Sequence, residues 1–265
     1  MKPPVESDPW VVLRRYTPAR IALGRAGASI PTAALLEFGI AHAQARDAVH
    51  ASLDVAGVVG QLAAAGFASL AVRSAARDRA HYLRRPDDGR RLDEPSRARL
   101  DACASTCTAT PELAIVIADG LSAMAAMRHA VPLLKELAPR LQGSVIAPIV
   151  VALQARVALG DEIGALLRAR QVVVLIGERP GLSSPDSLGL YLTHAPRPGR
   201  TDAERNCLSN VRPQGLGIAQ AASRLALLLD GARRLGRSGV DLKDESLNLP
   251  PADRSREAIG SGFSP

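Results

Sequence analysis

The sequence predicts an α/β fold in which an N-terminal helical portion is followed by a Rossmann-like, doubly wound and mainly parallel sheet. Three short apolar runs, at residues 113–118, 145–153 and 172–177, support this prediction. Helical patterns separate the runs, and strands that are apolar on both faces are typical of parallel sheets covered by helices on both sides. With 265 residues, of which 47% are hydrophobic, the chain is long enough to bury such a core.

The first 96 residues are expected to form a loose tail and a helical region. Three prolines among residues 1–9 indicate the tail, and a glycine-rich turn at 23–29 precedes a helix at about 33–49. A second helical region is expected at about 55–82. Its nearly uncharged part, 55–72, contains Gln61 and is short for a membrane span, so a buried helix or helix pair is the better interpretation. The charged, turn-rich residues 85–96 predict a domain boundary.

The second expected domain, residues 97–245, carries the Rossmann-like sheet, and residues 246–265 are expected to form a flexible tail. Helical patterns follow the apolar runs at about 122–136, from about 160, and at about 218–235. Ligands of doubly wound sheets bind outside the carboxyl ends of the strands. That rule indicates Asp119-Gly120, the segment around Val157, and Gly177-Glu178 as places where a ligand could bind.

The composition excludes few classes of protein by itself. The formal net charge is +7, almost all of the positive charge is arginine, and only 3% of residues are aromatic. A basic chain with so few aromatic side chains offers few platforms for base stacking, which argues against nucleic-acid binding, although that hypothesis stays open. Three cysteines indicate a reducing cytoplasm, and residues 1–6 lack the apolar core of a signal peptide.

The common catalytic and nucleotide-binding motifs are absent. The sequence contains no GxGxxG, no P-loop, no HExxH and no GxSxG. Its five histidines are scattered, which does not suggest a metal site, and Cys103 and Cys107 are interpreted as small apolar residues. An α/β chain of this kind is either an unusual enzyme or a subunit that contributes only part of a site.

Six segments, taken in order, resemble the small (light) subunit of ethanolamine ammonia-lyase. They are YTPARIALGRAG at 16–27, HAQARDAVH at 42–50, YLRRPDDGRRL at 82–92, IVIADGLSA at 115–123, IGERPGL at 176–182 and ERNCLSN at 204–210. The resemblance covers roughly residues 10–245. It implies a subunit of a lyase that converts ethanolamine to acetaldehyde and ammonia by the radical chemistry of adenosylcobalamin.

The resemblance also implies where the parts of the enzyme lie. A TIM-barrel large subunit is expected to hold the substrate and all catalytic residues, in a higher hetero-oligomer with the small subunit. The small subunit is expected to complete the cobalamin site at the interface through Val157, Glu178 and Cys207. No DxHxxG is present, so the cofactor's own base is expected to stay on cobalt. The complex is expected in the cytoplasm, and the sequence does not decide whether a bacterial microcompartment encloses it.

The residues alone support this site only in part. Glu178 follows an apolar strand, where its carboxylate could accept hydrogen bonds from corrin amides, but it could equally cap a turn or pair with Arg179. Val157 and Cys207 would by themselves be taken as core residues. The loop-like segment between Glu178 and Cys207 is expected to differ in length from relatives. A stand-alone enzyme using Asp119 and Ser122 is the alternative from another class.

Overall fold

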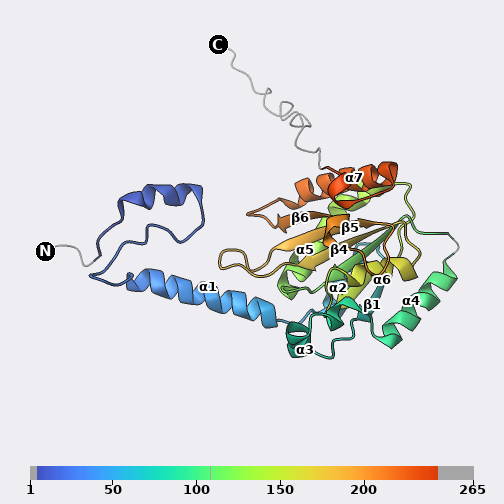
Figure 1. The fold of residues 1–265 in the computed structure, drawn as a ribbon, viewed down its shortest axis with the longest axis horizontal. Coiled ribbons are helices and arrows are strands. Elements are labelled where there is room, and N and C mark those ends of the chain that lie inside the picture. The colour runs from blue at the N-terminus through green and yellow to red at the C-terminus, as the bar shows by residue number, and fades with distance from the viewer. Residues whose placement is uncertain (1–4, 108, 244–265) are drawn as a thin grey trace, which may run out of the picture.

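The computed structural model describes residues 5–107 and 109–243. Figure 1 shows a body made of a sheet with helices on both faces, from which an N-terminal arm projects. The flexible tail expected at 246–265 lies outside the described residues, as do the first four residues of the tail expected at 1–9. The expected boundary near residue 96 stays a prediction.

A six-stranded sheet with the order β1-β3-β2-β4-β5-β6 forms the centre of the described body. Its first four strands in that order are parallel, and β5 and β6 are antiparallel to their neighbours. The strands are β1 (Ser69–Arg73), β2 (Leu113–Ala118), β3 (Ile149–Leu153), β4 (Gln171–Gly177), β5 (Leu188–His194) and β6 (Arg205–Val211). The predicted α/β fold with a mainly parallel sheet is therefore confirmed.

Helices connect the strands and cover the sheet. The α-helices are α1 (Thr32–His50), α2 (Val55–Ala64), α3 (Arg79–Arg84), α4 (Glu94–Thr106), α5 (Ala123–Leu137), α6 (Leu159–Leu166) and α7 (Ile218–Leu235). Short 3-10 helices are η1 (Pro9–Tyr16), η2 (Asp88–Arg90), η3 (Ala138–Leu141), η4 (Asp202–Glu204) and η5 (Gly239–Asp241). None of the described helices is both long enough and apolar enough to span a bilayer.

Two apolar layers hold the helices on opposite faces of the sheet. Side chains alternate along a strand, so Ile115 and Ile117 of β2 pack in the layer with α2, α5 and α7, whereas Val116 packs in the layer with α4 and α6. All six residues of β2 and all seven of β4 are buried. Burial on both faces explains why these strands are continuous apolar runs in the sequence.

Two parts of the sheet differ from the expectation. Strand β1 lies inside the stretch 55–82 that was expected to be helical, because α2 ends at Ala64 and Gly66 turns the chain with a φ of +80°. The segment between Glu178 and Cys207 was expected to be loop-like, but it contains β5, and Cys207 itself lies on β6. Strand β6 carries several exposed polar residues, which conceals it from a search for apolar runs.

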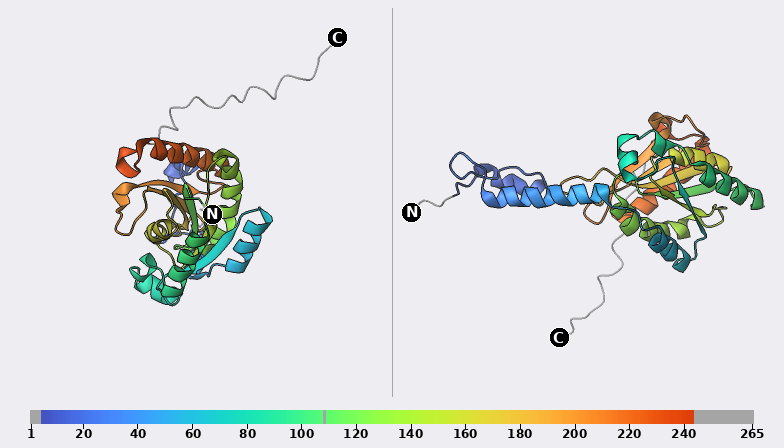
Figure 2. Two further views of the ribbon diagram at one scale, coloured as in Figure 1. Left: turned by 90° about the vertical axis from the view of Figure 1, so that its right-hand side faces the viewer. Right: turned by 90° about the horizontal axis from the view of Figure 1, so that it is seen from below.

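The N-terminal arm consists of residues 5–50 and includes η1 and α1. Figures 1 and 2 show that it extends away from the sheet. The end of α1 joins it to the body, and the Arg20 guanidinium donates to the carbonyl of Leu182 at 3.3 Å. Within the described chain, twelve of the seventeen exposed large apolar side chains lie between Val5 and Ile40. Of the 19 residues of α1, only Ala41 and Ala48 are buried. The arm therefore presents an apolar surface that the rest of this chain does not cover.

Candidate functional site

The chain order creates a crevice at the carboxyl ends of the parallel strands. From β2 the chain crosses through α5 to β3, and from β3 it returns through α6 to β4 on the other side of β2. Because α5 and α6 lie on opposite faces, the loops after β2 and β3 separate at this point. Such switch points are where doubly wound sheets bind their ligands.

Asp119, directly after β2, holds the two loops together. Its side chain accepts hydrogen bonds from the backbone N–H groups of Gln154 at 2.9 Å and Ala155 at 3.0 Å, and it pairs with Arg79 at 3.3 Å. Burial raises the pKa of the Asp119 carboxyl, although the amides and Arg79 favour its charged form. The Asp119 side chain thus links the end of β2 to the loop after β3, which is a structural role.

Gly120 allows the ends of β2 and β4 to approach closely. It has a φ of +53°, and a Cβ at this position would collide with the carbonyl oxygen of Gly177. The N–H of Leu121 donates to that same carbonyl at 2.9 Å. The loop after β2 is therefore fixed against the end of β4, where Glu178 begins the next loop.

The three segments indicated by the strand-end rule line one hollow. This strand-end hollow has a volume of about 450 Å³ and is an open depression in the surface. Gly120 and Leu121 contribute from the loop after β2, Arg156 and Val157 from the loop after β3, and residues 176–179 from the end of β4. Tyr82 of α3, Tyr191 of β5 and Ser209 of β6 complete it. Two of the three predicted contact residues, Val157 and Glu178, therefore lie on one surface.

Glu178 is held in a fixed orientation with its carboxylate half-buried. The Ser187 hydroxyl donates a short hydrogen bond to it, and the Asn210 N–H donates at 3.2 Å. On the other side, a Cβ at Gly189 would lie 3.1 Å from the carboxylate, so Gly189 leaves it room. No ion pair with Arg179 is present among the described residues, which removes one of the two structural roles considered for Glu178.

One part of the Val157 side chain packs against the apolar layer that contains α6. The other part faces the hollow, and α6 itself begins two residues later at Leu159. It is half-buried, so it is neither a full core residue nor a free surface residue. It can therefore offer apolar contact to a ligand.

Cys207 lies beside the hollow and is not among the residues that line it. It is exposed on β6, directly opposite Tyr191 of β5, whose ring lines the hollow. Desolvation raises the pKa of the Cys207 thiol, the hydrogen bond with Tyr191 lowers it, and the Glu178 carboxylate raises it further. The thiol is therefore neutral near pH 7 and offers soft packing, not a thiolate.

The alternative catalytic pair, Asp119 and Ser122, is occupied with structural bonds. The Ser122 hydroxyl donates to the carbonyl of Pro185 at 2.8 Å and accepts from the N–H of Ala125 as the N-cap of α5. Among the hydrogen bonds of the described residues, none joins either side chain to a histidine. Nothing there activates a nucleophile. Within residues 5–107 and 109–243, no three His, Cys, Asp or Glu residues cluster in a way that could hold a metal ion.

A larger depression adjoins the strand-end hollow, and sequence reasoning missed it. This arginine groove has a volume of about 1000 Å³ and shares Arg156, Val157 and Arg179 with the hollow. The scattered arginines of the sequence give no signal for it, because the fold brings them together from distant segments.

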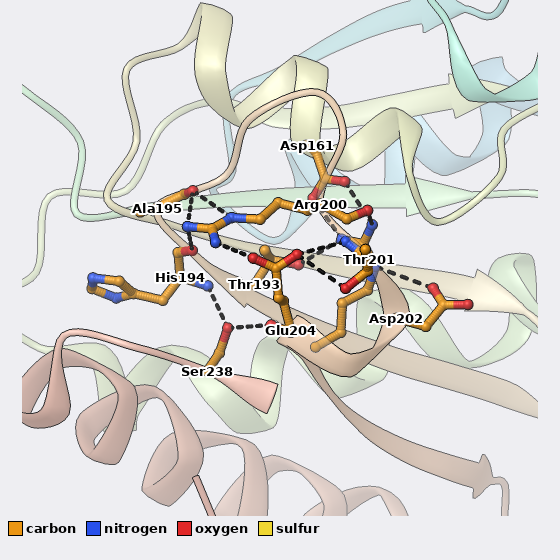
Figure 3. Close-up of polar contacts among 10 residues, drawn as sticks. Asp161, Thr193, His194, Ala195, Arg200, Thr201, Asp202, Glu204 and Ser238 are labelled. Carbon is orange, nitrogen blue, oxygen red and sulfur yellow. Dashed lines mark hydrogen bonds and ion pairs between the residues drawn. The ribbon is translucent and has the colours of Figure 1, made fainter. Parts of the chain in front are cut away.

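One wall of the arginine groove is the connection between β5 and β6. Figure 3 shows the polar network of this connection. The Arg200 guanidinium donates hydrogen bonds to the Glu204 carboxylate and to the carbonyl oxygens of His194 and Ala195. Beneath it, Arg205 forms two hydrogen bonds with Asp161, at 2.7 and 2.8 Å. These contacts fix residues 195–204 against α6.

Comparison with known proteins identifies the same family that the six sequence segments resemble. The family model described as ethanolamine ammonia-lyase light chain (EutC) matches residues 7–243. The chain is 56% identical over 254 residues to the ethanolamine ammonia-lyase small subunit of Ralstonia nicotianae, covering 95% of this chain and 94% of the relative. It is 58% identical over 245 residues to the protein of that name from Azotobacter vinelandii, covering 92% and 91%. The chain belongs to the ethanolamine ammonia-lyase light-chain family.

Proposed function

We propose that this chain is the small subunit of an adenosylcobalamin-dependent ethanolamine ammonia-lyase and completes the cobalamin site at the interface with the large catalytic subunit. Family membership supports the subunit identity. The observation that carries the site is the meeting of Val157 and Glu178 on one hollow at the switch point of the sheet.

The residues of the strand-end hollow suit the edge of a corrin. That edge carries neutral amide groups and apolar methyl groups, so it needs fixed hydrogen-bond acceptors beside apolar surface. The oriented carboxylate of Glu178 is such an acceptor, and Val157 and the ring of Tyr191 supply the apolar surface. When bound, adenosylcobalamin supplies the radical that starts the conversion of ethanolamine to acetaldehyde and ammonia.

Glu178, Val157 and Cys207 then have roles in binding, and none of them takes part in the chemistry. Glu178 would accept a hydrogen bond from a corrin amide, and the hydrogen bonds from Ser187 and Asn210 keep its carboxylate in a fixed orientation for this contact. Val157 excludes water from the contact. Cys207 supports the Tyr191 ring from the neighbouring strand. We assign no proton transfer to this chain, and we expect the catalytic residues on the large subunit.

The shape of the chain supports a partner. The hollow is open, so a second surface must cover a ligand bound there. The N-terminal arm exposes Trp10, Tyr16 and Phe38 with other apolar side chains, and a large uncovered apolar surface marks an interaction site. The relatives are named small subunits, and we therefore propose the large subunit as the protein that covers the arm.

The test uses this chain co-purified with the large subunit encoded in the same genome. Binding of hydroxocobalamin is measured by equilibrium dialysis for the wild-type pair and for Glu178→Ala and Glu178→Gln. Glu136→Gln is the matched control, because Glu136 is exposed near the end of α5, on the opposite layer of the sheet. Loss of a hydrogen bond to a charged acceptor predicts affinity about tenfold to a hundredfold weaker for Glu178→Ala.

The possible outcomes distinguish an error in the proposed site from an error in the proposed function. Unchanged affinity in Glu178→Ala would show that Glu178 makes no contact, and the proposed site would be wrong while family membership stood. A pair that forms but binds no corrinoid, or two chains that do not associate, would contradict the proposed function itself.

A further inference from the structure

The arginine groove concentrates positive charge beside the strand-end hollow. Seven arginines line it: Arg90, Arg91, Arg97, Arg156, Arg179, Arg200 and Arg205. Only two acidic residues, Glu162 and Asp202, are among the described residues that line the same groove. A depression with this balance favours an anionic ligand.

Most of these arginines already have carboxylate partners. The pairs are Arg90 with Asp87, Arg91 with Asp88, Arg97 with Glu162, Arg200 with Glu204, and Arg205 with Asp161. Arg156 and Arg179 are different, because neither forms an ion pair with any residue of the described chain. Their two charges remain available for a ligand.

Arg156 is held in place without being neutralised. Its guanidinium lies 4.6 Å from the centre of the buried Tyr82 ring, and its backbone N–H donates to the carbonyl of Gly89 at 2.8 Å. The Tyr82 hydroxyl donates to Ala155 at 3.0 Å, which fixes the ring. The Nε of Arg156 is buried and has no hydrogen-bond partner among the described residues. A cation stacked on an aromatic face is positioned in advance for an anion.

The position of the two arginines links the two depressions. Arg156 and Arg179 line both the strand-end hollow and the arginine groove. Arg156 comes from the loop after β3, just before α6 begins at Leu159, and Arg179 follows Glu178 after β4. An anionic group that reaches them would therefore be attached to, or adjacent to, whatever occupies the hollow.

We propose that Arg156 and Arg179 bind a phosphate ester, and that, if the proposed function holds, it is the phosphodiester in the nucleotide tail of cobalamin. The guanidinium fork matches the paired oxygens of a phosphate. The amides at the corrin edge are neutral, and the phosphodiester is the one anionic group at the periphery of that cofactor. A free phosphate compound is the other source of the same chemistry, and the experiment distinguishes the two.

The experiment compares three corrinoids that differ in the tail. Cobalamin carries the complete nucleotide, cobinamide phosphate carries the phosphate without the nucleoside, and cobinamide carries neither. Their dissociation constants are measured by equilibrium dialysis against the complex of this chain with the large subunit. The variants are Arg156→Gln and Arg179→Gln, and the control is Arg90→Gln, which lines the same groove but is paired with Asp87 at 3.3 Å.

We expect each of the two variants to bind cobalamin and cobinamide phosphate about tenfold to a hundredfold more weakly, and cobinamide as well as the wild type does. The control should leave all three affinities within about twofold. Because Arg156 also stacks on Tyr82, its variant could lose structure. Arg179 is exposed and stacks on no aromatic ring among the described residues, so Arg179→Gln provides the test if Arg156→Gln does not fold.

Three results would overturn the proposal. Equal losses for all three corrinoids would place the effect on the corrin or on the fold, and losses for cobalamin alone would place it on the nucleoside. Unchanged affinities for all three would show that the arginines bind no part of the cofactor.

If the wild-type complex binds no corrinoid, the proposed function fails and the anion site is tested separately. Inorganic phosphate is then dialysed against the same complex. Binding that both arginine variants lose and Arg90→Gln retains would support an anion site that serves a free phosphate compound. Absence of phosphate binding to the wild type in that case would overturn the site as well.

Discussion

The buried ion pair between Asp161 and Arg205 gives a quantitative prediction about the wall of the arginine groove. The two side chains are 1% and 3% exposed, and two hydrogen bonds of 2.7 and 2.8 Å join them. Arg205 also donates to the Thr193 hydroxyl at 3.0 Å and to the carbonyl oxygen of Arg200 at 2.8 Å. Arg205→Met would remove these four hydrogen bonds and a longer one to Asp202 at 3.4 Å, and it would leave the Asp161 carboxylate buried without its counter-ion.

Loss of one partner from a buried pair costs about 3–5 kcal/mol, which is roughly a hundredfold to several thousandfold in the opening equilibrium. Replacing both partners is much less costly, because no uncompensated charge stays inside. We therefore expect the double variant Asp161→Leu with Arg205→Met to be at least about 2 kcal/mol more stable than Arg205→Met alone. The exposed pair of Arg237 and Asp241 is the control, and Arg237→Met should change stability by less than about 0.5 kcal/mol.

Hydrogen–deuterium exchange of the complex with the large subunit, measured by mass spectrometry, gives the opening free energy of β5, β6 and their connection. Arg205→Met should lower that free energy strongly, Arg237→Met should leave it unchanged, and the double variant should restore much of it. The reasoning would be refuted if Arg205→Met exchanged no faster than the control, or if the double variant were as unstable as the single one.

Three further predictions concern other parts of the chain. In Gly89→Ala, the new methyl would lie 2.8 Å from the Tyr82 ring, so thermal unfolding should show a loss of about 1–3 kcal/mol; an unchanged midpoint would contradict this crowding. The Thr201 N–H and then Arg200 lower the pKa of Glu204 from 4.5 to about 2, so its stabilisation of η4 is complete above pH 4.5 and is lost as the pH falls toward 2. Protection factors of amides 201–205, corrected for the intrinsic exchange rate at each pH, that did not fall over this range would refute it. Replacing Trp10 by serine should weaken binding to the large subunit about tenfold in biolayer interferometry, whereas unchanged binding would show that this side chain is not buried in the interface.

The strands that were predicted correctly are those whose burial is complete. β2 and β4 are covered on both faces, so every residue must be apolar or small, and the sequence shows this as uninterrupted runs. β1 has only five residues at one edge of the sheet, and β6, at the other edge, exposes Cys207 and Ser209. Strands with so little buried surface leave a weak pattern, which is why β1 and β6 were not recognised. β5 was missed as well although five of its seven residues are buried, because Gly189, Thr193 and His194 interrupt its apolar run.

The candidate site was predictable only where it depends on the ends of buried strands. The strand-end rule led to Gly120, Val157 and Glu178, which do line one hollow. Cys207 came from the family resemblance alone and lies one strand further out, opposite Tyr191. Arg156 could not be found in the sequence as an anion site, because its character depends on a buried aromatic ring contributed by α3.

The claim that this chain completes a cobalamin site is tested most directly by comparing hydroxocobalamin affinity in the two-subunit complex, in the large subunit alone and in this chain alone. The account predicts tight binding only in the complex, weakened by Glu178→Ala and unaffected by Glu136→Gln. Equal affinity of the large subunit alone, with no change on adding this chain, would contradict it.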